Sequence, residues 1–313
     1  QVARQAAGSP LFAEELARVI AAGKAVATVP TIEAAIQVSL DALDGEAHDA
    51  IMRMSVFGST AWDKGLEAAG VDDVVRHMER LGEADLIVEQ ALSRFDGTRE
   101  YWFKHALVRD VTYASCSEAM RQELHGAVAS WLSEVGEDAA TIAEHYDLGG
   151  QHERAAGYWE KAARRALAAN ALSDAVKMAD RALTFADASE DAFARATLLD
   201  EIYSRLDERA AERAEAIEAM SDNAYDEACE VRTMGARARY DHARLAGHDV
   251  EERLIEVVER SAELGLLDEQ ARSLATLGSR YAYAGELPHA EMKAKQLLGL
   301  AETKGVAAAA GDA

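Results

Sequence analysis

Residues 101–110 read YWFKHALVRD and join the end of a β segment to the start of a helix. Tyr101, Trp102 and Phe103 are aromatic residues that favour strands, whereas the residues after His105 open a helix. A single histidine at such a junction is more often a satisfied polar residue than a ligand. The segments on either side of the decamer therefore decide how His105 is interpreted.

The chain before this junction predicts helices followed by a β-hairpin. The helices are expected at about residues 10–23, from Pro30 along TVPTIEAAIQVSLDAL, at 46–57 and at 71–83. One face of the first helix is apolar and carries Leu11, Phe12, Leu16, Val19 and Ile20, and Gly23 ends it. The second helix keeps Ile32, Ile36 and Leu40 on one apolar stripe. DLIVEQ and SRFDGTREYWF then predict two β segments, with Asp96-Gly97 near the turn. This order is typical of a winged helix.

DNA binding is the usual inference from a winged helix, but the helix expected at 71–83 is a poor reader of a DNA groove. It holds four acids against two arginines, namely Asp72, Asp73, Glu79 and Glu83 against Arg76 and Arg80. A winged helix that works inside the protein fits this charge pattern better.

The chain after this junction predicts helix after helix. Helices are expected at about 105–118, 120–134 and 151–169, and breaks near Gly149-Gly150, Asn170, Leu206-Asp207, Gly247 and Gly285. Two units share the same spacings: Ile142-Ala143, Tyr146, Gly150, Ala155, Trp159, Ala162 and Leu277-Gly278, Tyr281, Gly285, Ala290, Ala294, Leu297. This spacing matches the tetratricopeptide pattern. The predicted fold class is mainly α: a winged-helix domain with a small β-hairpin, then an α-solenoid of tetratricopeptide-like helical hairpins.

Composition sets limits on partners and location. The formal net charge of −23 disfavours contact with nucleic acid or with an anionic membrane. Two cysteines make no disulfide framework and no metal-ligand spacing, which favours a reducing cytoplasm. No signal peptide and no apolar run of membrane-spanning length is recognisable. The chain starts abruptly at Gln1 and ends in GVAAAAGDA, so both ends look like cuts through a longer protein.

Other chemistry was weighed against the same sequence. His145 and His152 lie seven residues apart, but a helix break separates them and no third ligand is evident, so we interpret them as surface residues and expect no metal site. Cys116 with His105 or His125 suggests a thiolate pair, yet a buried structural cysteine is the better interpretation. No Gly-x-x-x-x-Gly-Lys-Ser/Thr motif occurs, so this chain should not be catalytic alone.

The first 135 residues or so resemble the second half of a nucleotide switch of the STAND class, the AAA-related signalling ATPases of NB-ARC type. GSPLF at 8–12 is similar to the family's Gly-x-Pro-Leu motif. IQVSLDALDGEAHDAIMRMSVFG, at 36–58, is similar to the linker that joins the small helical domain to the winged helix. FKHALVRD, at 103–110, resembles the segment whose histidine contacts the β-phosphate of ADP.

This resemblance implies a nucleotide site formed by Gly8, Pro10 and His105. Pro10 would pack against adenine and His105 would sense the phosphate. The family often has aspartate directly after the histidine, where this chain has Ala106, so Arg109 or Asp110 would supply a supporting polar contact instead. ADP or ATP with magnesium would bind the intact parent protein, whose ATPase core lies upstream, and no nucleotide should bind this chain tightly.

The predicted domains are a remnant of the small helical domain at 1–45, a winged helix with its trailing helices at 46–135, and the repeat array at 136–313. We expect the array to bind a protein or peptide partner, with Tyr146, Trp159 and Tyr281 in its packing or partner surface. The expected function is signal transduction by a nucleotide-switched ATPase that assembles in several copies. The alternatives are a non-enzymatic interaction scaffold and part of a transcription regulator.

Overall fold

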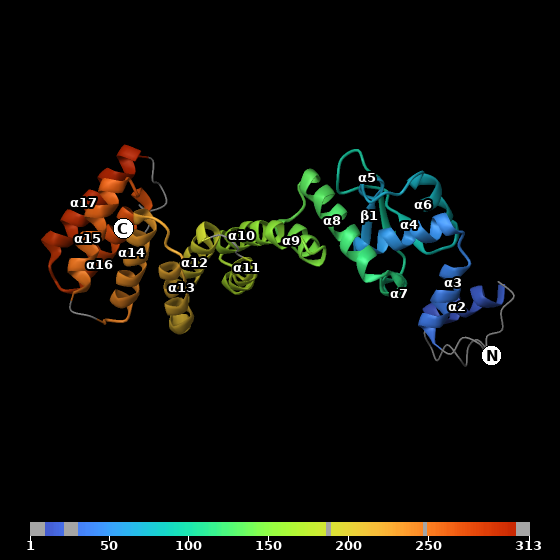
Figure 1. The fold of residues 1–313 in the computed structure, drawn as a ribbon, viewed down its shortest axis with the longest axis horizontal. Coiled ribbons are helices and arrows are strands. Elements are labelled where there is room, and N and C mark those ends of the chain that lie inside the picture. Colours follow the sequence, from blue (N-terminus) through green and yellow to red (C-terminus); the bar gives the residue numbers. More distant parts are fainter. Residues whose placement is uncertain (1–9, 22–30, 186–188, 247–248, 305–313) are drawn as a thin grey trace. The chain divides into compact units, whose positions relative to one another are not determined.

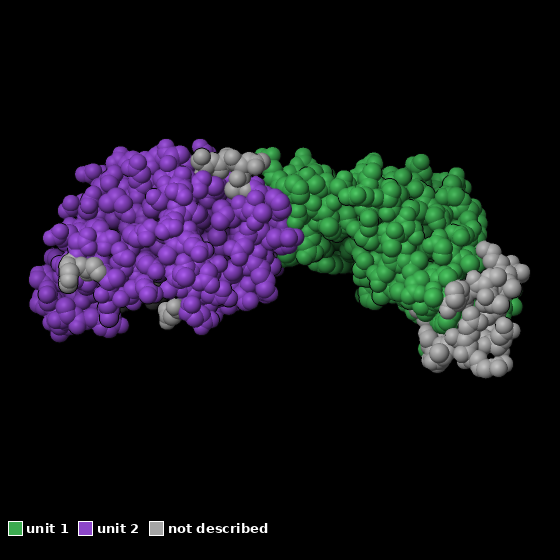
Figure 2. Space-filling model, turned by 60° about the horizontal axis from the view of Figure 1, so that its bottom comes forward, with its two compact units in different colours: residues 1–155 green, residues 156–313 purple. Residues whose placement is uncertain are grey.

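A computed structural model describes residues 10–21, 31–185, 189–246 and 249–304 of the 313-residue chain. This part is mainly helical and contains one three-stranded sheet (Figure 1). The chain forms two compact units, residues 1–155 and 156–313 (Figure 2). The domain boundaries expected near 45 and 135 stay predictions.

The first unit contains the sheet and the helices around it. Its elements are α2 (Pro10–Ala21), α3 (Ile32–Asp41), α4 (Gly45–Val56), β1 (Thr60–Trp62), α5 (Asp63–Ala68), α6 (Val74–Glu83), β2 (Ile87–Glu89), β3 (Glu100–Phe103), α7 (Ala106–Ser115), α8 (Glu118–Val135) and α9 (Ala139–Leu148). Several helices begin where a side-chain oxygen accepts a hydrogen bond from a free backbone N–H of the first turn. These capping residues are Thr31, Asp44, Ser117 and Asp138.

The sheet has the strand order β1-β3-β2, and both pairs are antiparallel. Val88 and Thr60 both lie opposite Trp102, which fixes the register of the three strands. The predicted hairpin of β2 and β3 is thus confirmed, and Gly97 in its loop has a φ of 74° that suits glycine. The strand β1 and the helix α5 were not predicted.

Apolar side chains from α3, α4, α6, the sheet and α7 form the core of this unit. The predicted stripe of α3 is confirmed by Ile36 and Leu40, which are buried, and Ile51 and Met54 of α4 are fully buried. In α2, Phe12 and Leu16 are buried against α3, whereas Ile20 is 48% exposed, and the side chains of Leu11 and Val19 lie outside the described part. Pro30 and Gly23 lie outside the described residues.

An aromatic cluster with one buried carboxylate supports the hairpin loop. Trp62, Phe95 and Trp131 lie with ring centroids 4.9–5.6 Å apart. Glu100 accepts hydrogen bonds from Nε1 of Trp62 at 3.0 Å and Nε1 of Trp102 at 2.6 Å. Burial alone would raise the pKa of Glu100, but these bonds and the one from the backbone N–H of Arg94 outweigh it and lower the pKa. The carboxylate therefore ties β1 to β3 beneath the loop.

The second unit is a run of helices that pack on their neighbours along the chain. They are α10 (His152–Ala168), which begins in the first unit, α11 (Leu172–Thr184), α12 (Ser189–Tyr203), the 3₁₀ turn η2 (Asp207–Arg209), α13 (Ala210–Asp222), α14 (Glu227–Ala243), α15 (Val250–Leu264), α16 (Leu267–Tyr283) and α17 (Leu287–Lys304). The breaks predicted at Asn170, Leu206-Asp207 and Gly285 are confirmed, and Gly247 lies outside the described residues.

Two buried ion pairs cross between helices of this unit. Nε of Arg213 donates to Asp200 at 2.8 Å. The guanidinium of Arg239 on α14 forms a two-bond pair with Glu269 on α16, in which the Nη2–Oε2 distance is 3.2 Å. Glu269 lies directly over Gly235, where a methyl group would overlap its Oε1 atom. This close approach of a carboxylate to the α14 backbone requires glycine.

Ala155 gives a test of packing density in α10. Its side chain is fully buried, and we expect Ala155→Leu to lower the free energy of unfolding by about 1–3 kcal/mol because the added methylenes must displace neighbours. Urea unfolding followed by circular dichroism would measure this. Ala168→Leu, at the exposed end of the same helix, serves as the control. Equal stability of the two variants would contradict the prediction.

Candidate functional site

His105 lies between β3 and α7, as the sequence predicted. It is the residue before the first turn of α7, has an extended backbone with φ −136°, and makes no capping hydrogen bond with its side chain. The side chain is 30% exposed, but Nε2 is buried and has no hydrogen-bond partner in the described part of the chain. An imidazole nitrogen at the start of a helix is thus left without a partner for hydrogen bonding.

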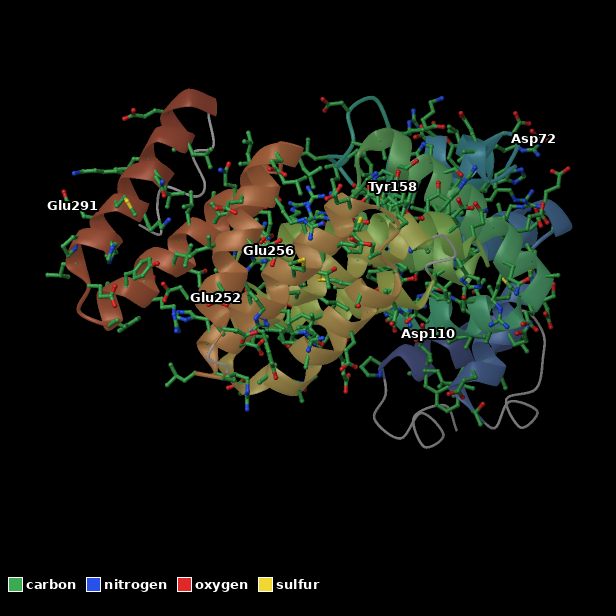
Figure 3. The ribbon with its side chains drawn as sticks, turned by 60° about the vertical axis from the view of Figure 1, so that its left-hand side comes forward. Asp72, Asp110, Tyr158, Glu252, Glu256 and Glu291 are labelled. Atoms are coloured by element: carbon green, nitrogen blue, oxygen red, sulfur yellow. The ribbon has the colours of Figure 1, made fainter. Side chains whose placement is uncertain are left out.

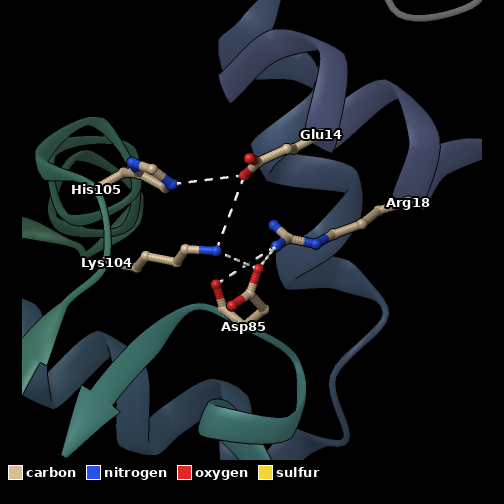
Figure 4. Close-up of polar contacts among 5 residues, drawn as sticks. All are labelled: Glu14, Arg18, Asp85, Lys104 and His105. Atoms are coloured by element: carbon tan, nitrogen blue, oxygen red, sulfur yellow. Dashed lines mark hydrogen bonds and ion pairs between the residues drawn. The ribbon is translucent and has the colours of Figure 1, made fainter. Parts of the chain in front are cut away.

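A cluster of four charged side chains surrounds this histidine (Figure 4). Asp85, in the tight turn before β2 with a φ of 60°, accepts hydrogen bonds at Oδ2 from Arg18 and Lys104, each at 2.5 Å. The bond from Lys104 lowers the pKa of Asp85 most; partial burial opposes this, and the charges of Lys104 and Arg18 add to the lowering. Asp85 therefore remains ionised and holds α2 close to the end of β3.

Glu14 is the fourth charged residue of the cluster, and it approaches both His105 and Lys104. Its Oε2 lies 3.7 Å from Nε2 of His105 and 3.9 Å from Nζ of Lys104. Both distances are too long for hydrogen bonds, so these contacts are electrostatic. Glu14 comes one turn after Pro10 in α2, so this contact lies near the start of that helix.

The other residues of the predicted nucleotide site are placed less closely. Pro10 is the exposed first residue of α2, and Gly8 lies outside the described residues. Arg109 and Asp110 form an ion pair with each other at 3.2 Å, and Asp110 is 56% exposed on α7 (Figure 3). A contact of either residue with His105 stays a prediction.

The three aromatic residues predicted for the repeat array are buried. Tyr146 lies under the guanidinium of Arg154, and Trp159 lies under that of Arg181. The hydroxyl of Tyr281 donates to Glu251 at 2.8 Å. Of the two roles predicted for them, internal packing fits their positions. Tyr158, beside Trp159, is only half-buried (Figure 3).

A buried chain of polar groups joins α7, α8 and α9, and the sequence did not predict it. The hydroxyl of Tyr113 lies 2.8 Å from Nε2 of His125, and Nδ1 of His125 lies 2.9 Å from Nδ1 of His145. Burial, with the nearby charge of Arg121, lowers the pKa of His125 to about 4; burial and His125 lower the pKa of His145 to about 3. Both rings are therefore neutral at pH 7.

This chain of polar groups corrects the interpretation of His145 as a surface residue. The residue is 8% exposed because its face of α9 packs on α8, whereas His152 is exposed. Cys116 is buried beside Ser55, as expected for a structural cysteine, and burial raises the pKa of its thiol. Among the residues described, no group of three or more histidine, cysteine or acidic side chains could hold a metal ion, and none of the described helices could span a membrane.

Both arginines of α6 form ion pairs with acidic residues of the same chain. Arg76 binds Glu46 at 2.6 Å and Arg80 binds Asp44 at 2.7 Å, so both pair with acids at the start of α4. Within α6, Val74–Glu83, Arg76 and Arg80 are the arginines and there is no lysine. Asp72, labelled in Figure 3, comes shortly before this helix. The surface that would read DNA in a winged helix is thus short of free positive charge.

Comparisons with known proteins give a structural likeness but no match in sequence. No protein-family profile and no curated protein sequence matches the chain. The chain is similar to the crystal structure of a Signal Transduction ATPase with Numerous Domains (STAND) protein with a tetratricopeptide repeat sensor from Pyrococcus horikoshii. The TM-score is 0.45 at 12% sequence identity, and the alignment covers 99% of this chain. The chain spans about half the length, 51%, of that structure.

Proposed function

We propose that this chain is the regulatory and sensor part of a nucleotide-switched signal-transduction ATPase. In this proposal the first unit contains a winged helix that clamps ADP through His105, and the helices that follow form tetratricopeptide-like repeats that bind a protein or peptide. The ATPase core would lie in the same polypeptide, in the cytoplasm, and bind ADP or ATP with magnesium. Partner binding would favour the open state, nucleotide exchange and assembly of several copies.

One observation carries the proposal. Two parts of the chain that are far apart in the sequence, α2 and the FKHALVRD segment, approach each other where Glu14 lies 3.7 Å from His105. The buried Nε2 of His105 has no hydrogen-bond partner among the described residues, as expected of a group whose partner is a ligand. Lys104, the residue before His105, and Arg18 both bind Asp85 in the same cluster.

The residues present fit a diphosphate. Lys104 and His105 would hold phosphate oxygens at the start of α7, where the helix dipole favours negative charge. Pro10, exposed on α2, would offer a flat apolar face to the adenine. When bound, ADP supplies negative charge that keeps the winged helix and α2 together. A hydrogen bond to a charged group contributes about 1.5–3 kcal/mol, which is enough to bias a two-state equilibrium.

The loss of His105 in the parent protein tests the clamp. We expect His105→Ala to accelerate ADP release about 10- to 150-fold, which corresponds to the loss of one charge-assisted hydrogen bond. Release would be followed with a fluorescent ADP analogue in stopped flow. His48→Ala, a half-buried histidine of α4 outside the cluster, is the matched control. An unchanged release rate in His105→Ala would remove the clamp from the proposal.

A cavity in the second unit favours a second function, that of an interaction scaffold. It has a volume of about 310 Å³ and is lined by side chains that include Phe193 of α12, Tyr225 before α14 and Arg272 of α16. A volume in this range suits a side chain or short peptide segment. The test is to denature the purified parent protein and to analyse the released nucleotide by chromatography, with added ADP as a standard. If the standard is detected but the protein releases no nucleotide, the interaction scaffold replaces the nucleotide switch as the proposed function.

A further inference from the structure

Within the cluster of four described side chains near His105, Glu14 brings the charges into balance. Arg18 and Lys104 contribute two positive charges, and Asp85 and Glu14 contribute two negative ones. Asp85 binds both cations at hydrogen-bond distance and is therefore part of the fixed frame. Glu14 stands apart from this frame. Without its charge, the cluster would carry one positive charge in excess beside an imidazole that has no hydrogen-bond partner in the described chain.

Glu14 is also the member that is easiest to displace. Its side chain is 49% exposed, and its distances to His105 and Lys104 are 3.7 and 3.9 Å. Exposed ion pairs without hydrogen bonds contribute little to stability. Glu14 is carried by α2, whose buried Phe12 and Leu16 pack on α3, so its position does not depend on the contact with His105.

We propose that Glu14 is an internal competitor of the phosphate, a carboxylate that occupies the anion-binding side of Lys104 and His105 until a diphosphate displaces it. This inference rests on the proposed function and adds regulation at the same site. The carboxylate weakens the binding of any anion to Lys104 and His105 and so sets the concentration at which the diphosphate closes the clamp. Displacement separates Glu14 from His105 while the bonds of Asp85 with Arg18 and Lys104 remain.

The inference predicts tighter anion binding when only the charge of Glu14 is removed. The probe is inorganic pyrophosphate, titrated at pH 7.5 into the ¹⁵N-labelled 313-residue chain and followed by the amide signals of residues 104–107. We expect Glu14→Gln to lower the Kd about five-fold, as for loss of one unfavourable contact between exposed charges. Glu33→Gln is the control, because Glu33 is exposed on α3 and forms no ion pair among the described residues.

His105→Gln separates this inference from the proposed function. A five-fold gain in Glu14→Gln, no gain in Glu33→Gln and weaker binding in His105→Gln support both. Weaker binding in His105→Gln without a gain in Glu14→Gln leaves the clamp and overturns the competition. A gain in Glu14→Gln with no effect of His105→Gln supports competition at Lys104 and contradicts the clamp. Equal gains in both glutamate variants, or no saturable binding by any variant, overturn the competition.

Discussion

Gly235→Ala should lower the free energy of unfolding by about 3–5 kcal/mol, the range expected when a buried ion pair is broken. The Cβ atom of alanine would occupy the position of Glu269 Oε1, which lies against the backbone of α14. Glu269 must then move away from Arg239. Both side chains are buried, with 3% and 14% exposure, so neither charge can turn to water.

Urea unfolding of Gly235→Ala and wild type would measure this loss. Gly157→Ala is the matched control, because Gly157 also lies inside a helix but an added Cβ atom there would meet nothing within 4 Å. Alanine favours helices more than glycine does, so this control should gain about 0.5–1 kcal/mol. A Gly235→Ala protein as stable as the control would show that the pair between Arg239 and Glu269 tolerates displacement.

The stability of the chain should fall by about 2–4 kcal/mol between pH 8 and pH 5 because of the buried histidines. His125 and His145 have pKa values of about 4 and about 3 in the folded chain, against an ordinary 6.5. Between these values the unfolded chain binds more protons than the folded chain. Their contribution to stability is therefore complete above pH 6.5 and is lost as the pH falls toward 4.

His145→Gln should reduce this pH dependence by about half, since one of the two buried titrating groups is removed. The measurement is the free energy of urea unfolding at pH 5, 6, 7 and 8. His48→Gln, which removes a histidine of α4 outside the contact, is the control. Identical slopes in wild type and His145→Gln would show that the histidine pair does not couple folding to protonation.

Helices with a periodic apolar face could be predicted from the sequence, whereas very short strands and turns could not. Ile36 and Leu40 define one face of α3, and that face is buried as predicted. Strand β1 has only three residues, Thr60–Trp62, and so shows no alternation that could be read. The helix expected at 71–83 begins at Val74, because Asp73 adopts a left-handed backbone at φ 45°. A backbone conformation of this kind at a single residue leaves no periodic signal in the sequence.

The sequence identified His105 as a candidate site residue, but it did not identify the charged residues that surround it. His105 and Lys104 are adjacent in FKHALVRD, so the sequence did contain a signal for Lys104. Glu14 and Arg18 had the appearance of ordinary surface charges of an amphipathic helix, and Asp85 that of a turn residue. Only the packing of α2 against the turn before β2 brings them together. His145 was placed wrongly for a related reason, since its partner His125 lies on another helix.

The helix α7 makes contact with other parts of the molecule near both of its ends. His105 precedes its first turn and faces Glu14, while Tyr113, eight residues later, lies 2.8 Å from His125. Eight residues of helix span about 12 Å and resist compression along the axis. A shift of His105 along α7 is therefore also a shift of Tyr113. Either the hydrogen bond between Tyr113 and His125 must then lengthen, or His125 and His145 must move as well. The rigid helix α7 therefore couples the position of His105 to that of the histidine pair.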